Sequence, residues 1–116
     1  MASYFLTRRA AMDLLQIHEY SAKRWSQSQA DNYVEKIIKG IQKAAINPSL
    51  GELRRHRVAP FLMVPVEKHF AIYKAVNEGI IVATVLHSSR DIETILDQID
   101  FKIANEIERL EKRLAK

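Results

Sequence analysis

The sequence contains no cysteine and only three glycines and three prolines in 116 residues. Without cysteine the chain has no disulfide scaffold, no cysteine–zinc site and no thiol nucleophile. Its three isolated glycines form neither a phosphate-binding loop nor a dinucleotide fingerprint. A Gly-x-Ser-x-Gly elbow for acyl transfer is also missing, and the carboxylates show no paired arrangement typical of glycoside hydrolases. Several large enzyme classes are therefore excluded.

Long apolar runs are absent as well, since no segment approaches the roughly 18 to 20 apolar residues of a membrane helix. The first residues lack the charged region and cleavage site of a signal peptide, so we expect a cytoplasmic protein that contacts no membrane. An apolar content of 47% predicts a single folded domain over residues 1–116. The net charge of +4 only mildly favours anionic partners. His18 and His69 have no second ligand at metal-binding spacing, so we expect no metal and no cofactor.

The clearest local signal is a β-hairpin over residues 69–87. Two runs rich in β-branched and aromatic residues flank residues 77–79, which end in Gly79, the residue best suited to the positive φ of a short loop. Both runs are apolar at odd and even positions alike. We therefore expect two central strands with other elements covering both faces.

The remaining pattern predicts a strand at residues 4–6, then a helix from Arg8 to about Arg24 capped by Thr7. A serine-capped interruption at residues 25–28 leads into a second, antiparallel helix that ends at a turn over 47–51. The basic stretch 52–60 is expected to begin as a loop. A strand follows at 61–66, and Pro65 places it toward an edge or bulge. We expect Trp25 and Tyr33 in the core of the helical hairpin.

The C-terminal segment from Ser89 onward has neither glycine nor proline, and its apolar residues recur every three or four positions. This pattern predicts a long amphipathic helix with Ser88 and Asp91 at its start, of which residues 97–116 form a C-terminal extension. The helix either bends back onto its own core or binds a partner or a second copy of the chain. The candidate partner-binding residues are Ile99, Ile103, Ile107, Leu110 and Leu114.

The predicted fold is therefore α+β, in the order β-α-α-β-β-β-α, with the helical hairpin packed on a small, mainly antiparallel sheet. Several motifs follow this order: Ala10-x-x-Asp13-Leu14-x-x-Ile17-x-x-Tyr20, then Trp25, Gln29-Ala30 and Tyr33, then Pro48-x-x-Gly51, His69-Phe70-x-Ile72-Tyr73 and Val85-Leu86-His87-x-x-Arg90-Asp91-Ile92. Over residues 4 to about 96 this arrangement resembles the ParE/RelE superfamily of toxins from bacterial type II toxin–antitoxin systems, and is closest to the ParE-like branch.

The resemblance implies two different activities. ParE-like toxins bind and poison DNA gyrase, whereas RelE-like toxins are metal-independent ribonucleases that cut mRNA on the ribosome. Ribonuclease chemistry needs a base for the 2′-hydroxyl, cations for the phosphate and an acid for the leaving oxygen. Here the resemblance would assign it to His87, Arg90 and Arg57. The chain has no tyrosine after Tyr73 and no histidine after His87, which favours a gyrase inhibitor without catalytic activity.

The resemblance also implies a cognate antitoxin, with a disordered or helical segment that wraps the sheet and the helical hairpin. A non-toxic interaction module that keeps only the fold is a third interpretation. His87 has a simpler interpretation as a helix cap or a hydrogen-bond partner of Asp91, and the basic stretch as a solvated loop. The candidate target-binding residues are Arg54, Arg55, Arg57, Lys68, Lys74, His87 and Arg90.

Overall fold

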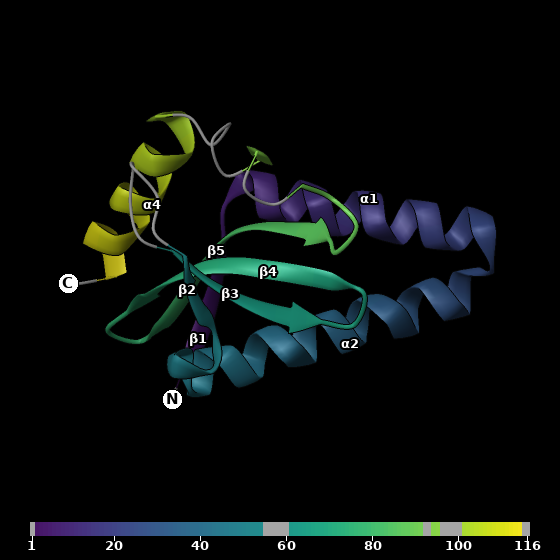
Figure 1. Cartoon of the computed structure of the whole chain (residues 1–116), viewed down its shortest axis with the longest axis horizontal. Helices are drawn as coiled ribbons and strands as arrows, with labels where there is room; N and C mark the ends of the chain where they lie inside the picture. Colours follow the sequence, from purple (N-terminus) through teal and green to yellow (C-terminus); the bar gives the residue numbers. More distant parts are fainter. Residues whose placement is uncertain (1, 55–60, 92–93, 96–100, 115–116) are drawn as a thin grey trace.

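A mixed five-stranded sheet lies between two helical layers in the computed structural model (Figure 1), which describes residues 2–54, 61–91, 94–95 and 101–114. The strand order is β1-β5-β4-β3-β2. Only β1 runs parallel to its neighbour, so the prediction of an α+β, mainly antiparallel fold is confirmed. The strands are β1 (Ser3–Leu6), β2 (Glu52–Arg54), β3 (Phe61–Val66), β4 (His69–Val76) and β5 (Gly79–His87).

The helical hairpin consists of α1 (Arg8–Arg24) and α2 (Gln27–Ile46) and begins as the sequence predicts. The Thr7 hydroxyl accepts a hydrogen bond from the Ala10 N–H and donates one to the Ala83 carbonyl, 2.8 Å away. Ser26 caps α2 in the same way, by accepting from the Gln29 N–H. Thr7 thus caps α1 and ties it to the central strand.

The β4–β5 hairpin forms the centre of the sheet, as predicted. Gly79 has a φ of 148° and lies opposite Val76, and β5 is buried from Gly79 to Leu86. A bulge near Ala83 changes which residues face the helices, because Ile72 pairs with Thr84 but Tyr73 pairs with Val82. The Thr84 hydroxyl and the Val85 N–H both donate to the Asp13 carboxylate of α1. The bulge therefore joins the helical hairpin to the sheet through polar contacts.

One strand was not predicted. Residues 52–54, expected to begin a loop, form the edge strand β2 and pair with residues 61–63 of β3. Pro65 lies beyond this pairing, opposite Phe70 of β4, which agrees with its predicted place toward an edge. Residues 55–60, the rest of the basic stretch, lie outside the described part of the chain.

The predicted start of the C-terminal helix is wrong. Residues 88–90 form a turn and a bend, and the cap is Asp91 rather than Ser88. The Asp91 carboxylate accepts from the Thr94 N–H at 3.2 Å, and the Asp91 carbonyl accepts from the Ile95 N–H. The helix α4 is described over Phe101–Leu114. Residues 92–93 and 96–100 lie outside the described residues.

The apolar stripe of α4 covers the face of the sheet opposite the helical hairpin. Ile107 is only 5% exposed and belongs to a core cluster with Phe61, Ile72, Ile81 and Leu86. Partly buried Ile103, Leu110 and Leu114 pack against the same cluster. Of the two interpretations of this helix, the structure shows the one in which it packs on its own core.

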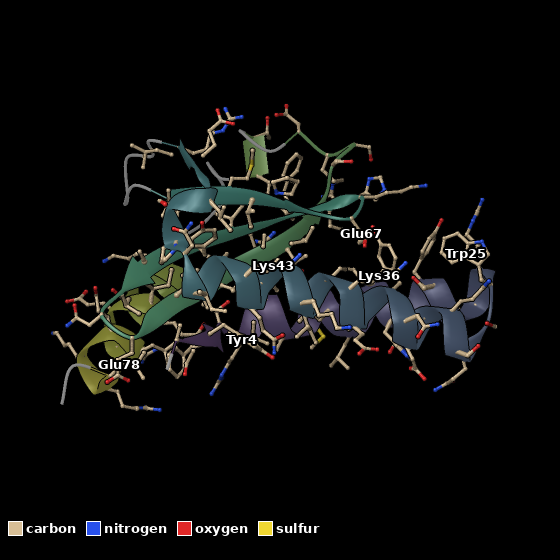
Figure 2. The ribbon with its side chains drawn as sticks, turned by 90° about the horizontal axis from the view of Figure 1, so that it is seen from below. Tyr4, Trp25, Lys36, Lys43, Glu67 and Glu78 are labelled. Carbon is tan, nitrogen blue, oxygen red and sulfur yellow. The ribbon has the colours of Figure 1, made fainter. Side chains whose placement is uncertain are left out.

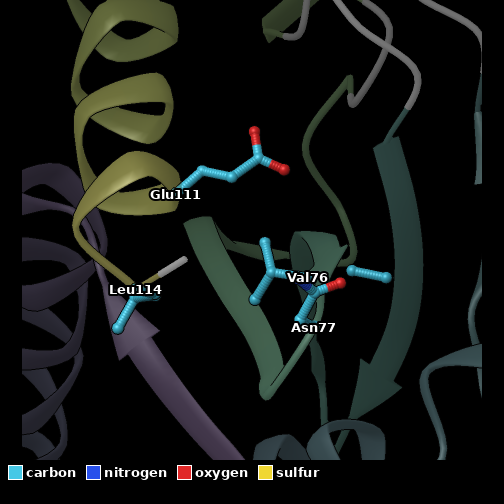
Figure 3. A pocket seen from close by; sticks show the side chains of 5 residues that line it. Val76, Asn77, Glu111 and Leu114 are labelled. Carbon is cyan, nitrogen blue, oxygen red and sulfur yellow. The ribbon is translucent and has the colours of Figure 1, made fainter. Parts of the chain in front are cut away.

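Polar contacts hold α4 at two points along its length. The Glu106 carboxylate accepts from the Arg8 N–H of α1, and Glu111 lies 2.9 Å from the Lys74 amine of β4. Figure 3 shows Glu111 and Leu114 beside Val76 and Asn77 at the β4–β5 turn, around a cavity of about 320 Å³. No helix in the described residues is long and apolar enough to span a membrane.

Candidate functional site

A large cavity lies where the helical hairpin extends past the sheet. It has a volume of about 720 Å³ and is bordered by α1, α2, the β3–β4 turn and the end of β5. Figure 2 shows Trp25 at this end of the hairpin and Glu67 in the turn that faces it. We call this cavity the hairpin groove. It is lined by Gln16, Ile17, Tyr20, Ser21, Trp25, Tyr33, Lys68, His69, His87, Ser89 and Arg90.

A chain of hydrogen bonds forms one wall of the groove. The Lys68 N–H donates to the Tyr33 hydroxyl at 3.2 Å, and that hydroxyl lies 2.8 Å from Nδ1 of His69. Burial and, to a lesser extent, the neighbouring His87 together lower the pKa of His69 to about 4. His69 is therefore neutral at pH 7, and we assign its Nδ1 as the acceptor of the Tyr33 hydroxyl proton. Burial also raises the pKa of Tyr33.

His87 lies across the sheet from His69, with ring centroids 5.0 Å apart and ring planes at 82°. The Ser89 N–H donates to Nδ1 of His87 at 3.0 Å, so this nitrogen is an acceptor and the proton of the neutral ring is on Nε2. The hydrogen-bond partner of His87 is thus Ser89 rather than Asp91. In this arrangement the basic nitrogen of each histidine is already hydrogen-bonded within the protein, and it would have to exchange that partner for a substrate to act as a general base.

The structure separates the predicted target-binding residues into groups. Lys68, His87 and Arg90 come together in the hairpin groove. Lys74 lies on the α4 side of the sheet, paired with Glu111, and Arg54 lies on the edge strand β2, 3.9 Å from Glu52. Arg55 and Arg57 lie outside the described residues, as does Ile99 among the predicted partner-binding residues.

Aromatic residues were missed as part of this site. Trp25 was expected in the core but is 57% exposed, and Tyr20 is 62% exposed. The guanidinium of Arg24 lies 5.9 Å from the Trp25 ring centroid. The sequence did contain a signal for the exposure of Trp25: the residue lies in the interruption between the two predicted helices, and therefore at the tip of the helical hairpin. Tyr33 is partly buried and packs against the core, as expected, but its hydroxyl reaches the groove.

The groove combines exposed aromatic rings with the cations of Lys68 and Arg90 and with two histidines whose Nδ1 atoms accept hydrogen bonds from within the protein. In the described residues, no group of three His, Cys, Asp or Glu side chains could hold a metal ion. The arrangement therefore suits the binding of a partner that is apolar in part and carries negative charge.

Comparison with known proteins places this fold in a family. Residues 4–92 match the family described as "ParE toxin of type II toxin-antitoxin system, parDE". Toxin ParE1 of Caulobacter vibrioides is 32% identical over 89 residues, or 77% of this chain and 92% of that protein. Toxin ParE1 of Mycobacterium tuberculosis is 29% identical over 91 residues, covering 78% and 93% respectively.

A solved structure supports the same fold. It is titled "Chromosomal ParDE TA system from P. aeruginosa" and aligns with a TM-score of 0.63 at 20% identity, covering 75% of this chain and 96% of that one. Residues 93–116, which include α4, lie beyond the family match. From residue 4 to residue 92, the chain belongs to the ParE toxin family of type II toxin–antitoxin systems.

Proposed function

We propose that this toxin inhibits DNA gyrase by binding it through the hairpin groove, without cleaving a substrate itself. The observation that carries the proposal is the state of the two histidines. Nδ1 of His87 accepts from the Ser89 N–H, and we assign Nδ1 of His69 as the acceptor of the Tyr33 hydroxyl, so in this arrangement the basic nitrogen of each ring is already hydrogen-bonded within the protein. The family membership supports the same activity.

The groove offers the residue types on which protein interfaces depend. Tryptophan, tyrosine and arginine dominate binding hot spots, and here Trp25, Tyr20 and Arg90 line one cavity. The two aromatic side chains are exposed although they are large. Their exposure has no evident role in stability, but it provides apolar area for a partner protein.

The purified chain should inhibit supercoiling of a relaxed plasmid by gyrase and increase the amount of cleaved plasmid. The Trp25→Ala variant should need about thirtyfold more protein for half-inhibition, since loss of a hot-spot residue costs about 2 kcal/mol or more. Ile46→Ala is the matched control, because Ile46 is 74% exposed and lies outside the groove. Unaffected supercoiling in the presence of the wild-type chain would overturn the proposal.

A ribonuclease remains the second candidate, because the structure brings Tyr33 and His69 beside His87 and Arg90. These side chains could supply an acid and a phosphate clamp if the Ser89 contact opened to free His87. Cleavage of a labelled mRNA in a translation reaction, lost in His87→Ala and retained in Ile46→Ala, would establish this activity. An intact mRNA with arrested supercoiling would exclude it.

The second part of the proposal is a cognate antitoxin that binds the sheet and the helical hairpin. Met12 and Leu15, three residues apart on α1, are exposed and could receive an apolar segment of such a partner. Binding through Ile103, Ile107, Leu110 and Leu114, or a homodimer through α4, would have to displace α4 from its own sheet. We therefore expect the antitoxin to bind without removing α4.

A further inference from the structure

The N-terminus of α1 carries an unusual concentration of positive charge. Its first turn contains Arg8 and Arg9 and no acidic residue. Positive side chains at this end of a helix are unfavourable, because the helix dipole is positive there. Arg9 donates to the Thr84 hydroxyl at 3.2 Å, which holds it against the sheet. A compensating charge comes from α4, where the Glu106 carboxylate accepts from the Arg8 N–H at 3.0 Å.

Two arginines of α4, Arg109 and Arg113, line the same cavity as Arg8. Glu106, Arg109 and Arg113 lie three and four residues apart and so share one face of the helix. Together with Arg8 and Leu110 they line a cavity of about 560 Å³, which we call the arginine pocket. It is formed jointly by the start of α1 and the middle of α4.

The guanidinium groups of this pocket lack acidic partners within the described ranges. Nearby lysines do have acidic partners: the Lys112 amine lies 3.4 Å from the Glu108 carboxylate, and the Lys74 amine lies 2.9 Å from the Glu111 carboxylate. No such ion pair involves the side chains of Arg8, Arg109 or Arg113 in the part of the chain that the structure describes. Three like charges thus face one cavity that holds a single carboxylate, so an anionic ligand would relieve their repulsion.

We infer that the arginine pocket binds phosphate groups of a nucleic-acid backbone. Guanidinium groups match the geometry of phosphate oxygens and are the commonest side chains at such contacts. Among the described residues the lining contains no aromatic ring on which a base could stack, so we expect the contact to read the backbone and not the sequence. Because two of the three arginines come from α4, the site lies largely outside the part of the chain that matches the family.

Binding of the full chain to a fluorescein-labelled 20-base-pair duplex, followed by fluorescence anisotropy at several salt concentrations, tests the site. The double variant Arg109→Gln/Arg113→Gln should bind at least about tenfold more weakly. Its slope of log affinity against log salt should be shallower by about 2, since each phosphate contact contributes about 0.9. A control with the same charge change is Lys36→Gln/Lys43→Gln, two exposed lysines of α2 (Figure 2). Equal losses in both double variants would overturn the inference.

A gain of affinity provides a test that misfolding cannot imitate. Replacing Glu106 with glutamine removes the carboxylate that competes with the phosphate, and should strengthen duplex binding several-fold. The control Glu19→Gln adds the same charge on the exposed face of α1, remote from the pocket, and should strengthen it less. Weaker binding by Glu106→Gln, or equal gains in both variants, would contradict a site at this pocket.

Competition distinguishes a polymer backbone from a small phosphate. An unlabelled duplex of unrelated sequence should displace the labelled duplex at micromolar concentration, whereas inorganic phosphate should require a concentration at least a thousandfold higher. Displacement by both at similar concentrations would show that the pocket takes a free phosphate, and would overturn the assignment to a nucleic acid. None of these readouts involves gyrase, so their failure would leave the proposed inhibition intact.

Discussion

His69 couples the hairpin groove to the protonation state of the protein. Its pKa of about 4 in the folded chain lies below the ordinary value of 6.5 because the ring is half-buried and faces His87. In the unfolded chain His69 is therefore protonated as the pH falls through about 6.5, whereas in the folded chain it is protonated only near pH 4. The free energy of unfolding therefore decreases on acidification: the contribution of His69 is complete above pH 6.5 and is lost as the pH falls toward 4.

Replacing His69 with asparagine should remove this part of the pH dependence, because an amide oxygen can still accept from Tyr33 but does not titrate. Between pH 7 and pH 4 the wild type should lose about 1–2 kcal/mol more unfolding free energy than the variant, an amount reduced by screening of the half-exposed ring. Urea unfolding at each pH measures it. His18→Asn, at an exposed hydrogen bond with Asp31, is the control. Parallel pH profiles for wild type and His69→Asn would contradict the prediction.

Residue contacts across the sheet were only partly predictable from the sequence. The short turn that ends at Gly79 sets the register, and counting back from the Val76–Gly79 pair would place Lys68 opposite His87. The bulge at Ala83 shifts the pairing by one residue, so that His69 lies there instead. A bulge between apolar residues leaves no mark in the hydrophobic pattern, which is why the two histidines were not predicted as neighbours.

At the scale of elements, α4 contributes to the core on the second face of the sheet. Ile107→Ala should lower the free energy of unfolding by about 2–5 kcal/mol, because Ile107 is 5% exposed and its truncation leaves a cavity. Ile46→Ala is the control at the exposed end of α2 and should change it by less than about 0.5 kcal/mol. Urea titrations of the three proteins give both values. Similar values for the two variants would mean that α4 does not pack on the sheet in solution.

Whether an element could be predicted from the sequence depended on how many of its residues follow a hydrophobic period. The long helices α1 and α2 and the β4–β5 hairpin were predicted because many residues share one period. The strand β2 has three residues with one apolar side chain, Leu53, which is too short for an alternation. The apolar stripe of α4 predicted that this face of the helix packs against another surface. Only the structure shows that this surface is the sheet of the same chain.

At the scale of the whole molecule, the two candidate sites lie at different ends. The hairpin groove is at the α1–α2 turn, and α4 lies at the end of the molecule away from that turn (Figure 1). Between them the sheet carries one core cluster on each face, and β3, β4 and β5 contribute residues to both clusters. A loss of packing on one face therefore weakens the strands on which the other face depends.

This shared sheet predicts a single cooperative unfolding transition. Trp25 is the only tryptophan, so its fluorescence reports the hairpin tip, whereas far-UV circular dichroism reports all elements including α4. In urea the two probes should give the same midpoint, and Ile107→Ala should lower both midpoints equally although Trp25 lies far from α4. A fluorescence midpoint that stayed at its wild-type value while circular dichroism lost an early, helical phase would show that α4 unfolds on its own. In that case α4 would be free to leave the sheet, and the predicted partner binding through Ile103, Ile107, Leu110 and Leu114 would gain support over the packed arrangement.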